Sequence, residues 1–136
     1  RRYFLERGAA AASFHPLWPG NTRDPALADV PWPLTAVYLG MGADGHVASL
    51  FPAADQAGFD GPGRLVAGRA PTPPNARISL SLPSILKAKH LFLQLSGPKK
   101  IAVYERARLE PPTPMLPVSL VLAAGHPSFR VYIAET

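Results

Sequence analysis

Residues 34–52 read LTAVYLGMGADGHVASLFP, an apolar run followed at once by a glycine-rich loop. The run is partly β-branched and aromatic, and two prolines bracket its start, which is typical of a buried strand. Glycine carries no Cβ, so the three glycines that follow allow the backbone to turn sharply and to approach a ligand closely. Open α/β sheets bind their ligands at the carboxyl ends of their strands. The sequence therefore predicts a strand that leads directly into a functional loop.

The loop is expected to continue into a short helix. Asp44 or Gly45 stands near the expected N-cap, and Pro52 ends the helix after about two turns. His46 then lies in the first turn, beside backbone N–H groups that have no partner within the helix. The segment thus combines a titratable imidazole, a carboxylate and an anion-attracting helix start.

Three interpretations of the loop are open. Gly40, Gly42 and Gly45 fit the G-x-G-x-x-G pattern of dinucleotide-binding loops. That fold needs a long helix, which Pro52 prevents, and Asp60, at roughly the spacing of the required acidic residue, lies in a turn sequence. The second interpretation is a tight structural turn with a satisfied histidine, and the third is a catalytic loop.

The full string at 40–52 closely resembles the motif G-x-G-x-D-G-H-x-A-S-L-F-P of 6-phosphogluconolactonases. The related motif of glucosamine-6-phosphate deaminases ends in a sequence like A-F-N-E-P, so the ending SLFP favours the lactonases. The resemblance continues downstream: RISLSL at 77–82 resembles R-I-T-L-T, GPKK at 97–100 resembles G-x-x-K, and LPV at 116–118 resembles L-P-A. Their order and spacing agree with the family, which favours the catalytic interpretation.

The resemblance covers only the C-terminal part of that family. Its N-terminal half carries a Gly-Gly-Ser/Thr phosphate loop and an Asp-Glu-Arg segment, and this sequence has neither. Thr35 and Thr72 also stand where the family has an acidic residue and a lysine. We therefore expect residues 1–136 to be a single α/β domain, the C-terminal portion of a larger lactonase domain. Such a sheet, incomplete at its N-terminus, has an exposed edge that can pair with another chain.

The rest of the chain alternates between expected strands and helices. Strands are expected at 13–18, 65–67, 77–82, 91–95 and 129–134, and helices at 1–14, 83–89, 98–109 and 118–124. A loop is expected at 53–63, and the proline-rich residues 111–117 are expected to be a stiff connector, with a polyproline ligand as the alternative. This order predicts a layered, Rossmann-like parallel or mixed sheet flanked by helices.

Composition narrows the class of protein. Of the 136 residues, 47% are hydrophobic and 17% are charged, which is typical of a globular domain. No apolar stretch approaches 18 residues and no signal peptide opens the chain, so no membrane association is expected. The lack of cysteine excludes disulfides and thiolate metal sites and suits a cytoplasmic protein, and the four histidines are scattered. We expect neither a metal nor a cofactor.

The net charge of +5 permits a nucleic-acid partner, but the distribution of the basic residues argues against one. No basic run is longer than two residues, and no motif combines basic with stacking aromatic residues. A pocket for a small phosphorylated substrate explains a basic site equally well, so no nucleic-acid binding is expected.

The resemblance implies hydrolysis of 6-phosphoglucono-1,5-lactone to 6-phosphogluconate, in the oxidative pentose phosphate pathway. A ring ester is reactive enough that a positioned base acting on water suffices without a metal. His46 is the expected base, because histidine titrates near neutral pH. Asp44 is expected to orient the imidazole or to cap the helix. Backbone N–H groups from Gly42 to Gly45 are candidates to bind the substrate's developing oxyanion.

Two basic residues are candidates to bind the substrate phosphate. Arg77 offers a guanidinium that matches phosphate oxygens in pairs, and Lys100 is the lysine of the G-x-x-K segment. A surface role is the alternative for each. Ser49 is a weaker candidate for a nucleophile, since no G-x-S-x-G elbow surrounds it.

Two other functions remain open at this point. A deaminase-isomerase acting on an amino sugar phosphate would release ammonia. A non-catalytic sugar-phosphate binder would bind phosphogluconate without turnover.

Overall fold

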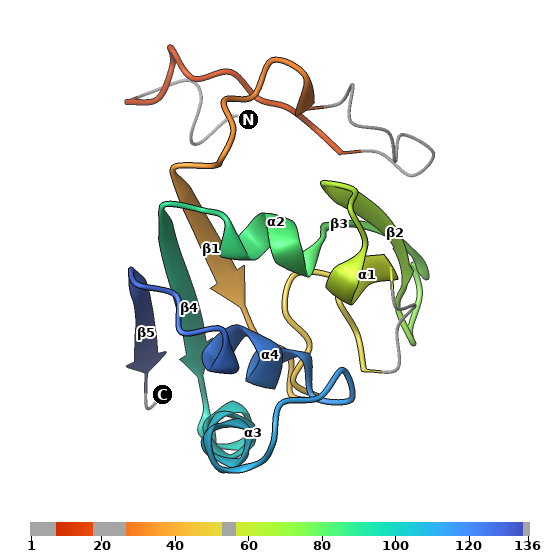
Figure 1. Cartoon of the computed structure of the whole chain (residues 1–136), viewed down its shortest axis with the longest axis vertical. Helices are drawn as coiled ribbons and strands as arrows, with labels where there is room; N and C mark the ends of the chain where they lie inside the picture. The colour runs from red at the N-terminus through yellow and green to blue at the C-terminus, as the bar shows by residue number, and fades with distance from the viewer. Residues whose placement is uncertain (1–7, 18–26, 53–56, 135–136) are drawn as a thin grey trace.

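The computed structural model describes residues 8–17, 27–52 and 57–134 (Figure 1). Its strands are β1 (Ala36–Gly40), β2 (Leu65–Arg69), β3 (Ala76–Leu80), β4 (His90–Ser96) and β5 (Phe129–Ala134). Its helices are α1 (Ala57–Asp60), α2 (Leu82–Leu86), α3 (Pro98–Leu109) and α4 (Pro117–Ala123).

The larger sheet has three parallel strands in the order β1-β4-β5. Val37 of β1 pairs with Leu91 of β4, and Leu93 of β4 pairs with Val131 of β5. Strands β2 and β3 form a separate antiparallel hairpin, which lies beyond α1 and α2 as seen from the larger sheet (Figure 1). The expected α/β class with a parallel sheet and flanking helices is confirmed.

One face of the sheet forms the core. Alternate residues of β4 (Leu91, Leu93 and Leu95) are buried, as the period of two in a strand requires. They belong to one hydrophobic cluster with Ile85 of α2 and Val121 of α4. The helices therefore pack on this side and hold the carboxyl ends of β1 and β4 at one edge.

The other face carries a row of aromatic side chains. Tyr38 of β1 stacks on Phe92 of β4 with ring centroids 5.1 Å apart, and Phe92 lies 6.3 Å from Tyr132 of β5. Tyr38 is 64% exposed and Tyr132 is 49% exposed. Within the described residues, this row is open to solvent.

The predicted helix after β1 is wrong. Residues 41–52 form turns joined by isolated bridges, among them Met41 with Val47. Gly45 has φ 84° and Ala48 has φ 51°, and neither left-handed conformation fits a right-handed helix. The N–H of Gly42 also donates to the carbonyl of His46 (2.9 Å), which closes a loop in place of a helical turn.

The remaining predictions are confirmed closely in most of the chain. The bounds predicted for α3 and β5 are those observed, and β2, β3, α2, β4 and α4 lie within three residues of prediction. In the expected loop at 53–63, residues 57–60 form the short α1. Residues 8–11 form a turn rather than the tail of a helix, and 13–17 contain no strand. The predicted segments at 1–7 and at residue 18 lie outside the described residues.

The proline-rich connector is a folded turn. The N–H of Thr113 donates to the hydroxyl of Ser119 (2.9 Å), and that hydroxyl donates to the carbonyl of Leu116 (2.6 Å). Leu116 and Pro117 are buried. These contacts favour the connector over an extended polyproline ligand.

Candidate active site

The loop at 41–52 holds His46 at the carboxyl edge of the sheet, immediately after β1. The N–H of Gly45 donates to the carbonyl of Gly42 (3.0 Å), inside the larger ring closed between Gly42 and His46. A β-carbon on Gly42 would overlap the imidazole of His46, so only glycine allows this close approach. The glycines of the motif therefore shape the loop around the histidine.

Asp44 and His46 form a hydrogen-bonded pair. Oδ1 of Asp44 accepts from the backbone N–H of His46 (3.2 Å) and lies 2.6 Å from Nδ1 of its ring. A carboxylate can only accept, so Nδ1 carries a proton and Nε2 of the neutral ring keeps a free lone pair. Asp44 thus orients the imidazole, one of the two roles that the sequence left open, and it also holds the turn. The other expected role, capping a helix, does not arise because residues 41–52, which follow β1, form turns and not a helix.

The pair keeps Asp44 ionised. Partial burial acts to raise the pKa of this carboxyl, but its hydrogen bonds from the backbone and ring of His46, with the positive charge of that ring when it is protonated, together lower the pKa. The stability that the carboxylate contributes is therefore fully present above the ordinary aspartate pKa of about 3.9. It is lost only as the pH falls through the lowered value, so the pair is intact at neutral pH.

Two neighbours fix the position of the pair. The ring of Phe51 packs against the imidazole with centroids 4.5 Å apart, and the side chain of His46 remains 31% exposed. The N–H of Val118, at the start of α4, donates to the carbonyl of Gly45 (3.0 Å). Leu116 fills the space where Gly45 lacks a β-carbon. The sequence resemblance marked these residues, but nothing in their pattern indicated these contacts.

The expected oxyanion role of Gly42 and Gly45 needs correction. Both N–H groups donate to carbonyls inside the loop, and the N–H of His46 donates to Asp44. In the described loop, these donors are therefore used to maintain its shape. The N–H of Ala43 makes no backbone hydrogen bond among the described residues and faces no such competition.

Arg77 leaves the hairpin on the face that contacts the loop. Ser79, two residues further along β3, accepts a hydrogen bond at its hydroxyl from the N–H of Ser49 (3.1 Å). Gly68, the partner of Arg77 in the hairpin, passes close to the carbonyl of Ser49. Arg77 is half-buried, and within the described residues it forms no ion pair. One of its terminal guanidinium nitrogens donates to the carbonyl of Ala76 (3.1 Å), which leaves the other N–H groups available to an anion beside the loop.

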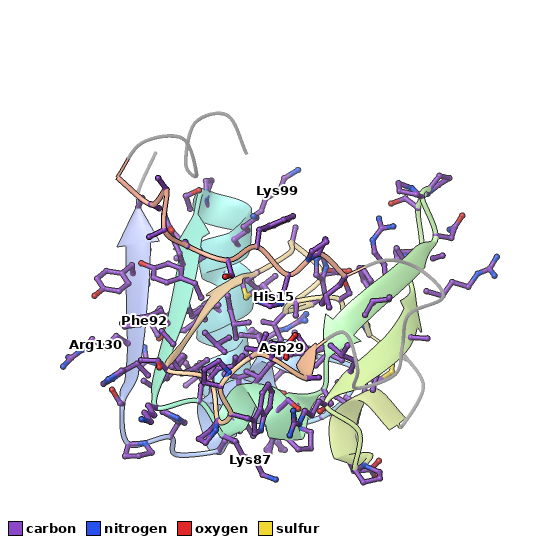
Figure 2. The ribbon with its side chains drawn as sticks, turned by 90° about the horizontal axis from the view of Figure 1, so that it is seen from above. His15, Asp29, Lys87, Phe92, Lys99 and Arg130 are labelled. Carbon is purple, nitrogen blue, oxygen red and sulfur yellow. The ribbon has the colours of Figure 1, made fainter. Side chains whose placement is uncertain are left out.

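Lys100 lies in the first turn of α3, which follows the carboxyl end of β4. Val103, one turn further along the same face of the helix, contacts the site of Gly45. Parallel strands end at one edge, so the start of α3 and the loop after β1 are neighbours. Figure 2 shows Lys99, next to Lys100, at the end of the molecule where the arrowheads of β4 and β5 lie. The structure therefore brings both predicted phosphate ligands to the side of the sheet that carries His46.

No metal centre is evident in the part of the chain that the structure describes. It contains no group of three or more histidine, cysteine, aspartate or glutamate side chains that could hold an ion. In the same residues, every helix falls short of the length and hydrophobicity needed to span a bilayer.

Comparison with known proteins identifies the family of the chain. Residues 21–130 match the family described as glucosamine-6-phosphate isomerases/6-phosphogluconolactonase, and the chain belongs to this family. A 6-phosphogluconolactonase of Helicobacter pylori is 34% identical over 140 residues, covering 98% of this chain and 61% of the relative. One of Neisseria meningitidis is 35% identical over 149 residues, covering 99% and 64%.

The fold of the chain also matches that of a solved structure of this family. The crystal structure of a 6-phosphogluconolactonase from Shewanella baltica matches with a TM-score of 0.79 and 31% identity, over 95% of this chain and 59% of that one. The chain thus spans about three-fifths of the length of these relatives.

Proposed function

We propose that this chain carries the hydrolytic site of a 6-phosphogluconolactonase, which converts 6-phosphoglucono-1,5-lactone to 6-phosphogluconate. The observation that carries the proposal is the Asp44–His46 pair, held by hydrogen bonds of 2.6 and 3.2 Å in the motif loop at the sheet's carboxyl edge. The names of the relatives support the substrate class.

The chemistry needs only one base. Nε2 of His46 takes a proton from water while the water oxygen bonds to the lactone carbonyl carbon and the carbonyl electrons move to oxygen. When the tetrahedral intermediate collapses, the bond from this carbon to the ring oxygen breaks and the imidazolium returns the proton to that oxygen. The new carboxylic acid then ionises in solvent. The carboxylate of Asp44 stabilises the imidazolium between these two transfers.

Substitution of Asp44 by asparagine tests that last step. Asparagine keeps an acceptor for the N–H of His46 but loses the charge, so we expect kcat to fall by about 10- to 100-fold, the value of a charge-assisted hydrogen bond. The measurement is kcat for lactone hydrolysis, corrected for spontaneous hydrolysis. An unchanged kcat would remove Asp44 from the mechanism.

Arg77 and Lys100 are proposed to bind the substrate phosphate. Because the phosphate does not react, its loss of contact should affect ground and transition states alike. We expect Arg77→Gln to raise KM by about tenfold with kcat unchanged, and Lys100→Gln to raise it less. Arg69→Gln is the matched control, since its side chain leaves the hairpin on the opposite face. A fall in kcat with constant KM would contradict the assignment.

One assay separates the proposal from its rivals. The purified protein is given the lactone, and in parallel glucosamine 6-phosphate, and both acid production and ammonia are measured. Accelerated acid production without ammonia is the expected result. Ammonia release would identify a deaminase, and saturable binding of 6-phosphogluconate without turnover would identify a binding protein.

We further propose that residues 1–136 correspond to the C-terminal portion of a larger lactonase domain and that the sheet pairs with further polypeptide. In support, the chain spans 61% of the Helicobacter relative, and in the described residues β1 and β5 each pair on one side only. We expect the isolated chain to associate, and Tyr38→Lys to weaken this association. Light scattering during gel filtration measures it, with the exposed Phe14→Lys as control. A strict monomer at high concentration would refute the pairing.

The same proposal includes the cellular setting. A cysteine-free sequence is consistent with work in the reducing cytoplasm. The partner is a phosphorylated sugar lactone, and neither a nucleic acid nor a membrane is part of the proposal.

A further inference from the structure

A second cationic hollow lies at the opposite end of the sheet from His46. It has a volume of about 400 Å³ and is lined by Trp32, Arg64, Lys87 and Ser84, with Asp60 and the glycine-rich turn after it. Trp32 precedes the amino end of β1, and Lys87 precedes the amino end of β4. The N–H of Lys89 donates to the carbonyl of Leu34 (2.9 Å), which joins these two amino ends.

The length of β1 separates this hollow from the active-site loop. Four steps of about 3.3 Å place about 13 Å between its first and last residues, Ala36 and Gly40. Figure 2 shows Lys87 at the end of the molecule away from Lys99 and the strand arrowheads. The hollow is therefore not part of the proposed lactone site.

The centre of the hollow is Arg64 stacked on an aromatic ring. Its guanidinium carbon lies 4.8 Å from the centroid of Trp32, and the side chain is half-buried. A guanidinium that lies over a ring keeps its N–H donors at its edge, where they can grip an oxyanion in pairs. The ring thus holds the cation in place without consuming its hydrogen bonds.

Within the described residues, the two cations of the hollow have no protein acceptor. In the described part of the chain, no ion pair or side-chain hydrogen bond involves Arg64 or Lys87. Ser84 is 4% exposed, and its hydroxyl forms a hydrogen bond with that of Ser81 (3.0 Å). Asp60, the one carboxylate at the hollow, is engaged in an interaction of its own.

From these observations, we propose that the hollow is a second binding site, for the oxyanion of a small phosphorylated or carboxylated molecule. Two cations against one engaged carboxylate give it a positive charge. The volume falls in the range of pockets for small metabolites and exceeds the need of a single inorganic ion. Arg64 is the principal ligand, with Lys87 and the hydroxyl of Ser84 as further donors.

The test uses Trp32 as its own reporter. Trp18→Phe removes the other tryptophan of the chain, and fluorescence is followed during titration with inorganic phosphate and, separately, citrate at constant ionic strength. We expect saturable binding of at least one probe, weakened about tenfold by Arg64→Gln and less by Arg64→Lys, which keeps the charge but loses the paired donors. The stronger probe distinguishes phosphate from carboxylate chemistry.

Matched variants distinguish binding in this hollow from nonspecific attraction of anions to the net positive charge of the protein. Arg69→Gln removes an exposed charge from β2 outside the hollow and should leave both affinities unchanged. His46→Ala should also leave them unchanged, and Arg64→Gln should leave lactone hydrolysis unchanged, so this proposal and the lactonase proposal can fail separately. Absence of saturation with both probes, or an equal loss in Arg69→Gln and Arg64→Gln, would overturn the proposal.

Discussion

Replacement of His46 by alanine is expected to lower the rate of lactone hydrolysis by about 10²- to 10⁴-fold, the usual contribution of a general base. The imidazole is the group in the described loop that combines a free lone pair with a fixed orientation, because Nδ1 is held by Asp44 at 2.6 Å. Its ring is 31% exposed and packs on Phe51, so its removal should cost little stability. The measurement is kcat at saturating lactone with the spontaneous rate subtracted.

Two controls make the result specific to the base. His15→Ala removes an exposed histidine from outside the loop and should leave kcat unchanged. His46→Gln keeps a side chain that can accept from and donate to its neighbours but cannot shuttle a proton at neutral pH, and it should be as inactive as alanine. If His46→Gln retained full activity, the imidazole would be a structural residue of the turn and the lactonase mechanism would need another base.

Several features of the fold could be predicted from local sequence because local rules decide them. Pro98 suits the first position of α3, where its missing N–H costs nothing, and the alternation of buried and exposed residues fixes β4. The loop after β1 shows where such rules stop. Asp44 has the sequence of a helix cap, but Ala48 adopts a left-handed conformation that alanine rarely takes, and no local pattern announces it.

The candidate site likewise has one part that local sequence indicates and another part that depends on distant residues. The Asp44–His46 pair spans two residues, and the motif indicated both residues, although it left open whether Asp44 orients the imidazole or caps a helix. The contacts that hold it come from far along the chain: Val118 bonds to Gly45, and Ser79 bonds to Ser49. Such contacts depend on how the hairpin and α4 fold back onto the loop, which is decided by packing of the whole core. The N–H groups of Gly42 and Gly45 donate within the loop for the same reason: their partners are set by the folded shape of the loop, and local sequence does not determine that shape.

Gly45→Ala is expected to have the second large effect, on stability and activity together. Gly45 has φ 84°, a conformation that costs an ordinary residue about 1–2 kcal/mol. A β-carbon there would also overlap the side chain of Leu116, and overpacking of this kind costs about 1–3 kcal/mol more. We expect the free energy of unfolding to fall by about 2–5 kcal/mol in all, measured by denaturant titration. A shift of the loop by about 1 Å would also lower kcat by about 100-fold.

Gly125→Ala separates the cost of the left-handed backbone conformation from the cost of the overlap with Leu116. Gly125 has φ 60° but has nothing within 4 Å of its would-be β-carbon, so it should lose only the backbone share of about 1–2 kcal/mol and retain its activity. The excess loss in Gly45→Ala then measures the contact with Leu116, the N-cap residue of α4, which packs against the loop that carries His46. Equal losses in the two variants, with activity intact in both, would show that the contact with Leu116 does not position His46. The loop would then owe its shape to its internal hydrogen bonds and to the bonds from Val118 and Ser79.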